Sequence, residues 1–367
     1  MIPPNDEEKE NITRGLLLED SKGAYKAFPA YFKLYESIFC PAEEHDTIIQ
    51  IHNPAFDCHD DIIKCARRLR ANPMLTREEL ARILSLNQAV SERDCQNAIQ
   101  SVIRVAFMLD CSLKDKYLPN YKVGGYSPAR WEAGEPFIAY IKRAISRSSL
   151  PQESGFEVYK HKNDLKAWKL KKRCHLQFLP TDNIIEHLLY NPKTRIVRVF
   201  HHTAYLKAHL RRLKDKPISL DASASLKLGM LPPQVLAETL HTIQFILFPV
   251  SGYKAQKSIR ILDVLVRKHG FDPNAELNEG RIRNDGTEVR YWYWNDRLEV
   301  LYHLAKNPPP RNRLVGWVER HTTERNALTV AIIGLFLSAF FGLITCLIGG
   351  AQLAIAILAW KDPKKSS

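Results

Sequence analysis

The longest apolar run of the chain lies near its C-terminal end. From Ala327 to Trp360, 34 residues follow one another without a charged side chain. Roughly 18 uncharged apolar residues already predict a membrane-spanning helix, and buried core helices are usually shorter. The pattern therefore predicts a transmembrane segment at 327–360, followed by a short tail at 361–367.

This segment is longer than a bilayer requires. As one helix it would measure about 51 Å, against a hydrocarbon core of about 30 Å. Gly349-Gly350 offers a point at which the helix can break. The excess length is compatible with a spanning helix followed by a short interfacial piece, with one tilted rod, or with a short hairpin. We expect a single span.

Small residues recur at every fourth position of this segment. Such spacing forms a groove in which a second helix can pack closely, which predicts a homodimer through the transmembrane helix. The alternative is that small residues are simply common in membrane helices. The predicted helix-packing residues are Gly334, Ser338, Gly342, Cys346 and Gly350.

Amphipathic spacing predicts three helices within residues 59–113: one at 60–70, a short one at 77–84, and a long one after Ser91. Thr76 and Glu79 have the spacing of a capping box ahead of the second helix. This arrangement is typical of helix-turn-helix and winged-helix units, and also of many small helical bundles. The polar residues of the third helix that would reach bases are Arg93, Gln96, Asn97, Gln100 and Arg104.

The following part of the chain mixes helices with strands. An apolar strand is predicted at Arg195–Phe200, and the turn signal Asp285-Gly286 predicts a β-hairpin over Arg281–Trp294. Helices are predicted at 181–190, 202–213, 233–248, 252–268 and 296–305. The expected fold class is α+β and mainly α-helical, with a winged-helix-like unit, a mixed unit with a hairpin, and a C-terminal transmembrane helix.

Proline- and glycine-rich stretches indicate the domain boundaries. We expect a disordered lead at 1–20, a helical unit at 21–150 and a basic mixed unit at 151–307. The run Pro308–Pro310 then opens a stiff connector and juxtamembrane segment at 308–326.

The net charge of +13 is concentrated in one region. Between Gly155 and Lys216 there are 15 Lys or Arg and 5 Asp or Glu, a net charge of +10. Such a block favours an anionic partner such as acidic lipid headgroups or nucleic acid, although it is also compatible with a solvated face. The predicted anionic-surface-binding residues, which surround Trp168, are Lys166, Lys169, Lys171, Lys172 and Arg173.

Cysteine and histidine positions predict no metal site. The seven cysteines include no pair with the spacing of a zinc ligand set. Cys58 and Cys65 lie near His52 and His59, but Cys65 falls in an amphipathic pattern in which it acts as a small hydrophobe. The neighbours His201 and His202 are expected to point apart in a helix or a strand.

No common catalytic motif is present: the chain has no phosphate-binding glycine loop, no nucleophile elbow and no paired zinc-protease histidines. We therefore assign no catalytic, cofactor-binding or metal-binding residue, and expect no cofactor. The absence of these motifs argues against most common hydrolases, kinases and dehydrogenases.

Three stretches resemble a group of uncharacterised fungal membrane proteins with a C-terminal transmembrane segment. They begin at Phe200 (Phe-His-His-Thr-Ala-Tyr-Leu-Lys), Tyr291 (Tyr-Trp-Tyr-Trp-Asn-Asp-Arg-Leu) and Trp317 (Trp-Val-Glu-Arg-His-Thr-Thr-Glu-Arg-Asn). The resemblance covers residues 170–363 and implies a membrane anchor. It implies no activity.

Residues 1–11 are acidic and polar, unlike a signal peptide, so we expect a body that faces the cytosol and an anchor inserted after synthesis. Lys364 and Lys365 resemble a dilysine signal for the endoplasmic reticulum, which a cytosolic receptor could read only if the anchor were a hairpin. The expected function is that of a membrane-anchored interaction or scaffold protein. The alternative is a membrane-tethered nucleic-acid-binding protein using residues 59–113, and an enzyme of unrecognised type comes third.

Overall fold

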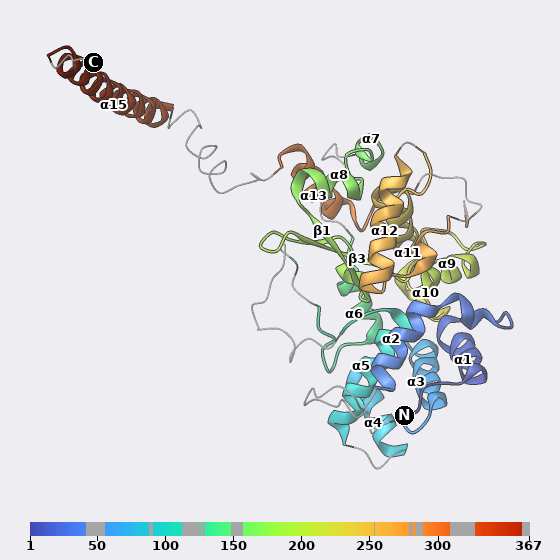
Figure 1. The fold of residues 1–367 in the computed structure, drawn as a ribbon. Coiled ribbons are helices and arrows are strands. Elements are labelled where there is room, and N and C mark those ends of the chain that lie inside the picture. Colours follow the sequence, from blue (N-terminus) through green and yellow to red (C-terminus); the bar gives the residue numbers. More distant parts are fainter. Residues whose placement is uncertain are drawn as a thin grey trace. The chain divides into compact units, whose positions relative to one another are not determined.

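The computed structural model describes residues 1–41, 56–87, 91–111, 126, 129–147, 157–252, 254–278, 282–283, 289–308 and 327–361. The chain forms two compact units, Met1–Asn307, here called the body, and Pro308–Ser367. The body is mainly helical with one small sheet, and one long helix is described in the second unit (Figure 1). The predicted α+β, mainly helical class is confirmed.

Helices in the first half of the body bury one apolar face each. In α3 (His59–Ala71), Ile62, Ala66 and Leu69 are buried on one side. The capping box is present before α4 (Arg77–Asn87): the Thr76 amide donates to the Glu79 carboxylate at 2.9 Å. The other elements are α1 (Asp6–Ile12), a π-helical turn (Thr13–Leu17), a 3₁₀ turn (Ala24–Ala27), α2 (Pro29–Phe39), α5 (Glu92–Phe107) and α6 (Phe137–Ala144).

The second half of the body adds further helices around the sheet. Predicted helices at 202–213, 233–248, 252–268 and 296–305 are confirmed, with small shifts of their ends. The elements are α7 (Val158–His161), α8 (Ala167–Cys174), α9 (Thr203–Arg212), α10 (Ala222–Lys227), α11 (Pro233–His241) with a π-helical continuation (Thr242–Leu247), α12 (Ala255–His269), a 3₁₀ turn (Pro273–Ala275) and α13 (Asn295–Lys306).

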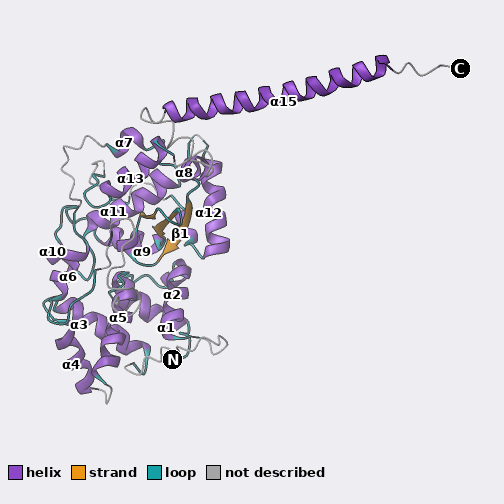
Figure 2. Cartoon of the chain, turned by 90° about the vertical axis from the view of Figure 1, so that its left-hand side faces the viewer, coloured by secondary structure: helices purple, strands orange, loops and turns teal. Residues whose placement is uncertain are grey.

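The sheet has three strands in the order β1-β3-β2. β1 (Gln177–Thr181) runs parallel to β3 (Ile196–Phe200), and β2 (Leu189–Asn191) runs antiparallel to β3. Figure 2 shows these strands enclosed by helices. The predicted strand at 195–200 is confirmed. The predicted helix at 181–190 is wrong: the segment holds one 3₁₀ turn (Ile184–Glu186), and Leu188 has a φ of 61°, which no right-handed helix accommodates.

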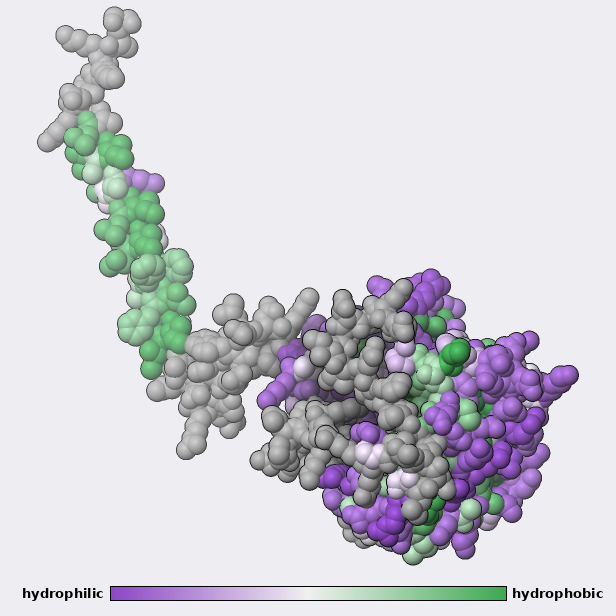
Figure 3. Space-filling view, turned by 90° about the horizontal axis from the view of Figure 1, so that it is seen from below, coloured by the Kyte–Doolittle hydropathy of each residue, from purple (hydrophilic) through white to green (hydrophobic). Residues whose placement is uncertain are grey.

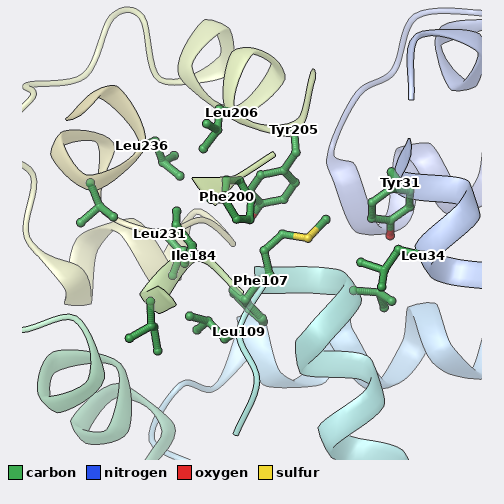
Figure 4. Close-up of a cluster of buried hydrophobic side chains, with 14 of the residues drawn as sticks. Tyr31, Leu34, Phe107, Leu109, Ile184, Phe200, Tyr205, Leu206, Leu231 and Leu236 are labelled. Atoms are coloured by element: carbon green, nitrogen blue, oxygen red, sulfur yellow. The ribbon is translucent and has the colours of Figure 1, made fainter. Parts of the chain in front are cut away.

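One hydrophobic core runs through the whole body. Figure 4 shows Tyr31 of α2 and Phe107 of α5 in the same cluster as Phe200 of β3 and Tyr205 of α9. Side chains from both sides of the expected boundary near residue 150 therefore share one interior. Residues 1–307 form a single compact unit, and the expected units 21–150 and 151–307 are parts of it.

The first 20 residues are not a disordered lead. Ile12, Leu16 and Leu17 are buried in the core. The guanidinium of Arg70, buried in α3, donates to the carbonyls of Gly15 and Leu16, both at 2.6 Å. The polar and acidic residues at the start of the chain favoured a prediction of disorder, whereas Ile12, Leu16, Leu17 and Leu18 pack against the core.

The predicted β-hairpin is not formed by the residues that the structure describes. The turn at 284–288 lies outside the described residues, and residues 289–294 form no strand. The backbone amides of Trp292, Tyr293 and Trp294 donate to the buried carboxylate of Glu238 in α11. A side chain thus takes the hydrogen bonds that a partner strand would have taken.

The second unit holds α15 (Ala327–Lys361), which is continuous through Gly349-Gly350 and forms no hairpin. Residues 331–358 are long and apolar enough to cross a membrane, and none of this stretch is buried in the structure. Figure 3 shows its surface as hydrophobic along almost its whole length. The coarse prediction, one C-terminal helix able to act as an anchor, is confirmed.

Candidate functional sites: a basic surface, a small-residue stripe and a histidine–aspartate cluster

The predicted anionic-surface residues lie on and beside α8. Its apolar residues Ala167, Leu170 and Cys174 are buried, which leaves Lys171, Lys172 and Arg173 exposed on the opposite face. Lys166 and Lys169 are half-buried at the start of the helix. Burial lowers the pKa of Lys166, and the nearby charges of Lys169 and Lys162 lower it further.

The structure adds two lysines from a distant part of the chain. α12 packs against α8 and brings Lys254 and Lys257 to the ring of Trp168, with Nζ 5.6 and 4.7 Å from its centroid. The Nζ of Lys169 lies 6.0 Å from the same centroid. Each contact has cation–π geometry, but three like charges around one ring also repel one another. We call Lys166, Lys169, Lys171, Lys172, Arg173, Lys254 and Lys257 the basic surface.

Acidic side chains offset only part of this charge. Asp164 pairs with Lys169 at 3.1 Å and lies 3.9 Å from Arg173. The sequence did not reveal Lys254 and Lys257 because more than 80 residues separate them from Trp168. Only the packing of α12 on α8 shows that they belong to the same surface.

The basic surface lies beside the end of the body from which the chain leaves for the anchor. α8 packs on α13, and the Sγ of Cys174 donates to the carbonyl of Leu304 at 3.1 Å. Leu304 is in the last turn of α13, which ends at Lys306. The basic surface and the exit point of the chain therefore share one region of the body.

All five predicted helix-packing residues lie in the continuous α15. The Oγ of Ser338 donates to the carbonyl of Gly334 at 3.0 Å, so its polar group is satisfied within the helix. A methyl group added at Gly334, Gly342 or Gly350 would meet nothing within 4 Å. Residues four apart rotate by about 40° around a helix, so the five form a slanted stripe.

A cluster of polar side chains lies at the carboxyl ends of strands β1 and β3. The Nε2 atoms of His201 and His202 lie 3.0 and 2.8 Å from Oδ1 of Asp182. Both histidines are buried, and their rings contact each other in a tilted arrangement with centroids 4.0 Å apart. Arg104 of α5 approaches the other oxygen, Oδ2, at 3.4 Å.

The electrostatics of the cluster favour a neutral His201 next to an ionised Asp182. Burial lowers the pKa of His201 to about 4, with a further contribution from His202. Burial alone would raise the pKa of Asp182, but hydrogen bonds from both histidines outweigh it and hold that pKa well below its usual range. Among the described residues, this is the one group of His, Cys, Asp and Glu whose ligand atoms could meet at a metal ion.

Other residues singled out in the sequence are not brought together. Cys65 is buried in the core, and the exposed Cys58 donates to Asp61. The ring of His59 contacts the hydroxyl of Tyr35, and His52 lies outside the described residues.

The third helix of the predicted winged-helix-like unit, α5, lies largely inside the body. Of its polar side chains, Asn97 is exposed, Gln96 and Gln100 are half-buried, and Arg104 is paired with Asp182. The side chain of Arg93 lies outside the described residues. The three-helix order is confirmed, while nucleic-acid binding stays a prediction.

No family model, no curated protein and no solved structure matches this chain. Kinship with the fungal membrane proteins therefore stays a prediction.

Proposed function

We propose that this protein is a membrane-anchored interaction protein whose basic surface binds anionic lipid headgroups beside its own anchor. One observation carries the proposal: lysines from α8 and α12 gather around Trp168, next to the end of α13. Each Lys or Arg close to an anionic membrane surface contributes about 1 kcal/mol. Several acting together can hold a tethered body against the bilayer.

Tethering strengthens this weak attraction. The connector 308–326 has 19 residues and can extend no further than about 65 Å. Anchoring α15 therefore keeps the basic surface at a high local concentration of headgroups, and no separate diffusional encounter is needed. The half-buried indole of Trp168, bordered by ammonium groups, also suits the interfacial layer, where aromatic rings are enriched.

A cytosolic orientation of the body agrees with its thiols. No disulfide joins the cysteines, five of them are buried, and burial raises the pKa of Cys65 to about 12. Thiols of this kind are typical of proteins in a reducing compartment. The cytosolic leaflet is also the one rich in anionic lipid.

Hydrogen–deuterium exchange on the full chain in lipid nanodiscs tests the proposal. We expect amides at 166–174 and 254–260 to exchange more slowly in nanodiscs containing phosphatidylserine than in neutral phosphatidylcholine nanodiscs. High salt should remove the difference because screening weakens exposed charges. Lys254→Glu with Lys257→Glu should remove it as well.

A matched control changes the same net charge elsewhere. Lys142 of α6 and Lys227 of α10 are exposed and outside the basic surface. Lys142→Glu with Lys227→Glu should leave the protection intact. Equal exchange in both nanodiscs, or equal loss in the control, would show that the basic surface does not bind headgroups.

The alternative, a membrane-tethered nucleic-acid-binding protein, draws on the three-helix order of α3, α4 and α5. It predicts that changing Asn97 and Gln100 weakens retention on DNA and leaves the lipid-dependent protection unchanged. Sequence-selective DNA retention by the full chain would favour this alternative over lipid binding.

A further inference from the structure

Two adjacent parallel strands end side by side and bring three potential metal ligands together. Thr181, the last residue of β1, is the register partner of Phe200, the last residue of β3. Asp182 follows the first strand, and His201 and His202 follow the second. Ligand sites are common at the carboxyl ends of neighbouring parallel strands. The chain turns away from the sheet there, so side chains that follow two strands can meet.

The local backbone explains why two adjacent histidines point to the same place. His202 is the residue before α9, and its φ of −72° and ψ of 70° belong to neither strand nor helix. The chain turns at this position, so the two side chains do not point in the different directions that a regular strand or helix would give them. The ring planes are tilted by 35° to each other, and both Nε2 atoms lie within hydrogen-bond distance of one oxygen of Asp182.

We propose that Asp182, His201 and His202 form a binding site for a divalent transition-metal ion of the zinc class. Two imidazole nitrogens and one carboxylate oxygen are the protein ligands of many mononuclear sites that keep positions open for water or substrate. Bonds of about 2.0–2.1 Å to a tetrahedral ion place ligand atoms roughly 3.3 Å apart. The observed Nε2–Oδ1 separations of 3.0 and 2.8 Å need only a small expansion, and all three ligand atoms lie within 4.8 Å of one another.

The surroundings define how each ligand would bind. Arg104 lies on Oδ2 of Asp182, which leaves Oδ1 to face the histidines, so the carboxylate binds through one oxygen. The side chain of Asp182 is 29% exposed, whereas those of His201 and His202 are 7% and 1% exposed. Solvent therefore reaches the ion from the side of Asp182, where a water molecule completes its coordination.

A second carboxylate, that of Asp272, contributes negative charge near the proposed site. Asp272 accepts hydrogen bonds from the hydroxyl of Thr203 and the amide of Ala204, at the start of α9. Its negative charge also acts on His201. Asp182 and Asp272 together offset most of the positive charge that Arg104 and a divalent ion would place at the ends of these strands.

The test titrates Zn²⁺ into the full-length protein in detergent after removal of metal by a chelator. Calorimetry should show one Zn²⁺ bound per chain, and Co²⁺ in its place should give visible absorption bands of nitrogen and oxygen ligation. Asp182→Asn keeps an oxygen that can accept both histidine N–H groups, so this variant should fold. Its affinity should fall by at least about 100-fold, the upper end of what loss of an outer-shell partner costs.

His209→Gln is the matched control, because His209 is a buried histidine of α9 that stacks on Tyr205 and lies outside the cluster. It should bind Zn²⁺ as the unchanged protein does. His201→Gln should lose binding, and if circular dichroism shows that it does not fold, Asp182→Asn decides alone. A folded protein that takes up no Zn²⁺, or an Asp182→Asn variant with unchanged affinity, would overturn the site.

Discussion

Glu238 shows how a single buried side chain can organise a distant segment. Its carboxylate accepts hydrogen bonds from the amides of Trp292, Tyr293 and Trp294 at 2.6, 2.9 and 3.1 Å. The side-chain amide of Gln234 donates to the same group at 2.7 Å. A segment that reads as strand in the sequence is thereby held in an irregular conformation against α11.

The protonation of Glu238 links stability to pH. Burial raises the pKa of Glu238 to about 7 from its ordinary value of 4.5, although its hydrogen bonds act in the opposite direction. The folded chain therefore binds the proton more tightly than the unfolded chain. The contribution of Glu238 is fully present below about pH 4.5 and is lost as pH rises through 7, amounting to about 3 kcal/mol.

Urea unfolding of the full chain in detergent between pH 5 and 8 should show this loss. Glu238→Gln removes the titrating group and should flatten the pH dependence. Glu7→Gln, at an exposed position, should keep it. A free energy of unfolding that rises with pH in the unchanged protein, relative to Glu238→Gln, would contradict the assignment.

Residue patterns in the sequence could not reveal the histidine–aspartate cluster. His201 and His202 were expected to point apart because regular structure separates neighbours, and the turn between β3 and α9 is visible only in the fold. Asp182 was placed in a helix. Its position at the end of β1 depends on strand pairing with residues 196–200, a contact that no local pattern encodes.

At the scale of elements, helices were predicted well because their signals are local. The capping box at Thr76 and the apolar spacing of α3, α5, α9 and α13 each lie within one segment of the chain. Strand assignments depended on distant partners. Of the three strands of the sheet, the sequence therefore predicts one. It also predicts a hairpin over residues 281–294, where the buried carboxylate of Glu238 accepts the backbone hydrogen bonds instead.

The stripe of small residues on α15 predicts dimerisation at the same scale. A slanted stripe at four-residue spacing suits a right-handed helix crossing, in which two backbones approach closely. Gly342→Leu should weaken the dimer because the added side chain fills the groove. In the single chain this side chain starts in open space, with nothing within 4 Å of the added Cβ.

Ala351→Leu is the matched control, because Ala351 is an exposed residue of the same helix and lies about 180° around it from Gly342. Energy transfer between differently labelled full-length chains in liposomes should fall for Gly342→Leu and remain for Ala351→Leu. Transfer that is absent in the unchanged protein, or equal in the two variants, would argue against packing through the stripe.

At the scale of the whole molecule, the chain is one compact body followed by one long apolar helix. The boundary at Pro308 was visible in the sequence because a proline run changes the composition abruptly. The unity of residues 1–307 was not visible, because it rests on a core shared by α2, α5, β3 and α9. The basic surface likewise exists only where α12 meets α8.

We propose that α15 anchors this protein in a lipid bilayer. Alkaline carbonate extraction of membranes from cells that express the full chain tests it most directly, with a variant that lacks residues 327–361 as comparison. We expect the full chain to remain in the membrane pellet and the shortened chain to be released into the supernatant. Release of the full chain by carbonate would show that α15 does not anchor the protein in the membrane.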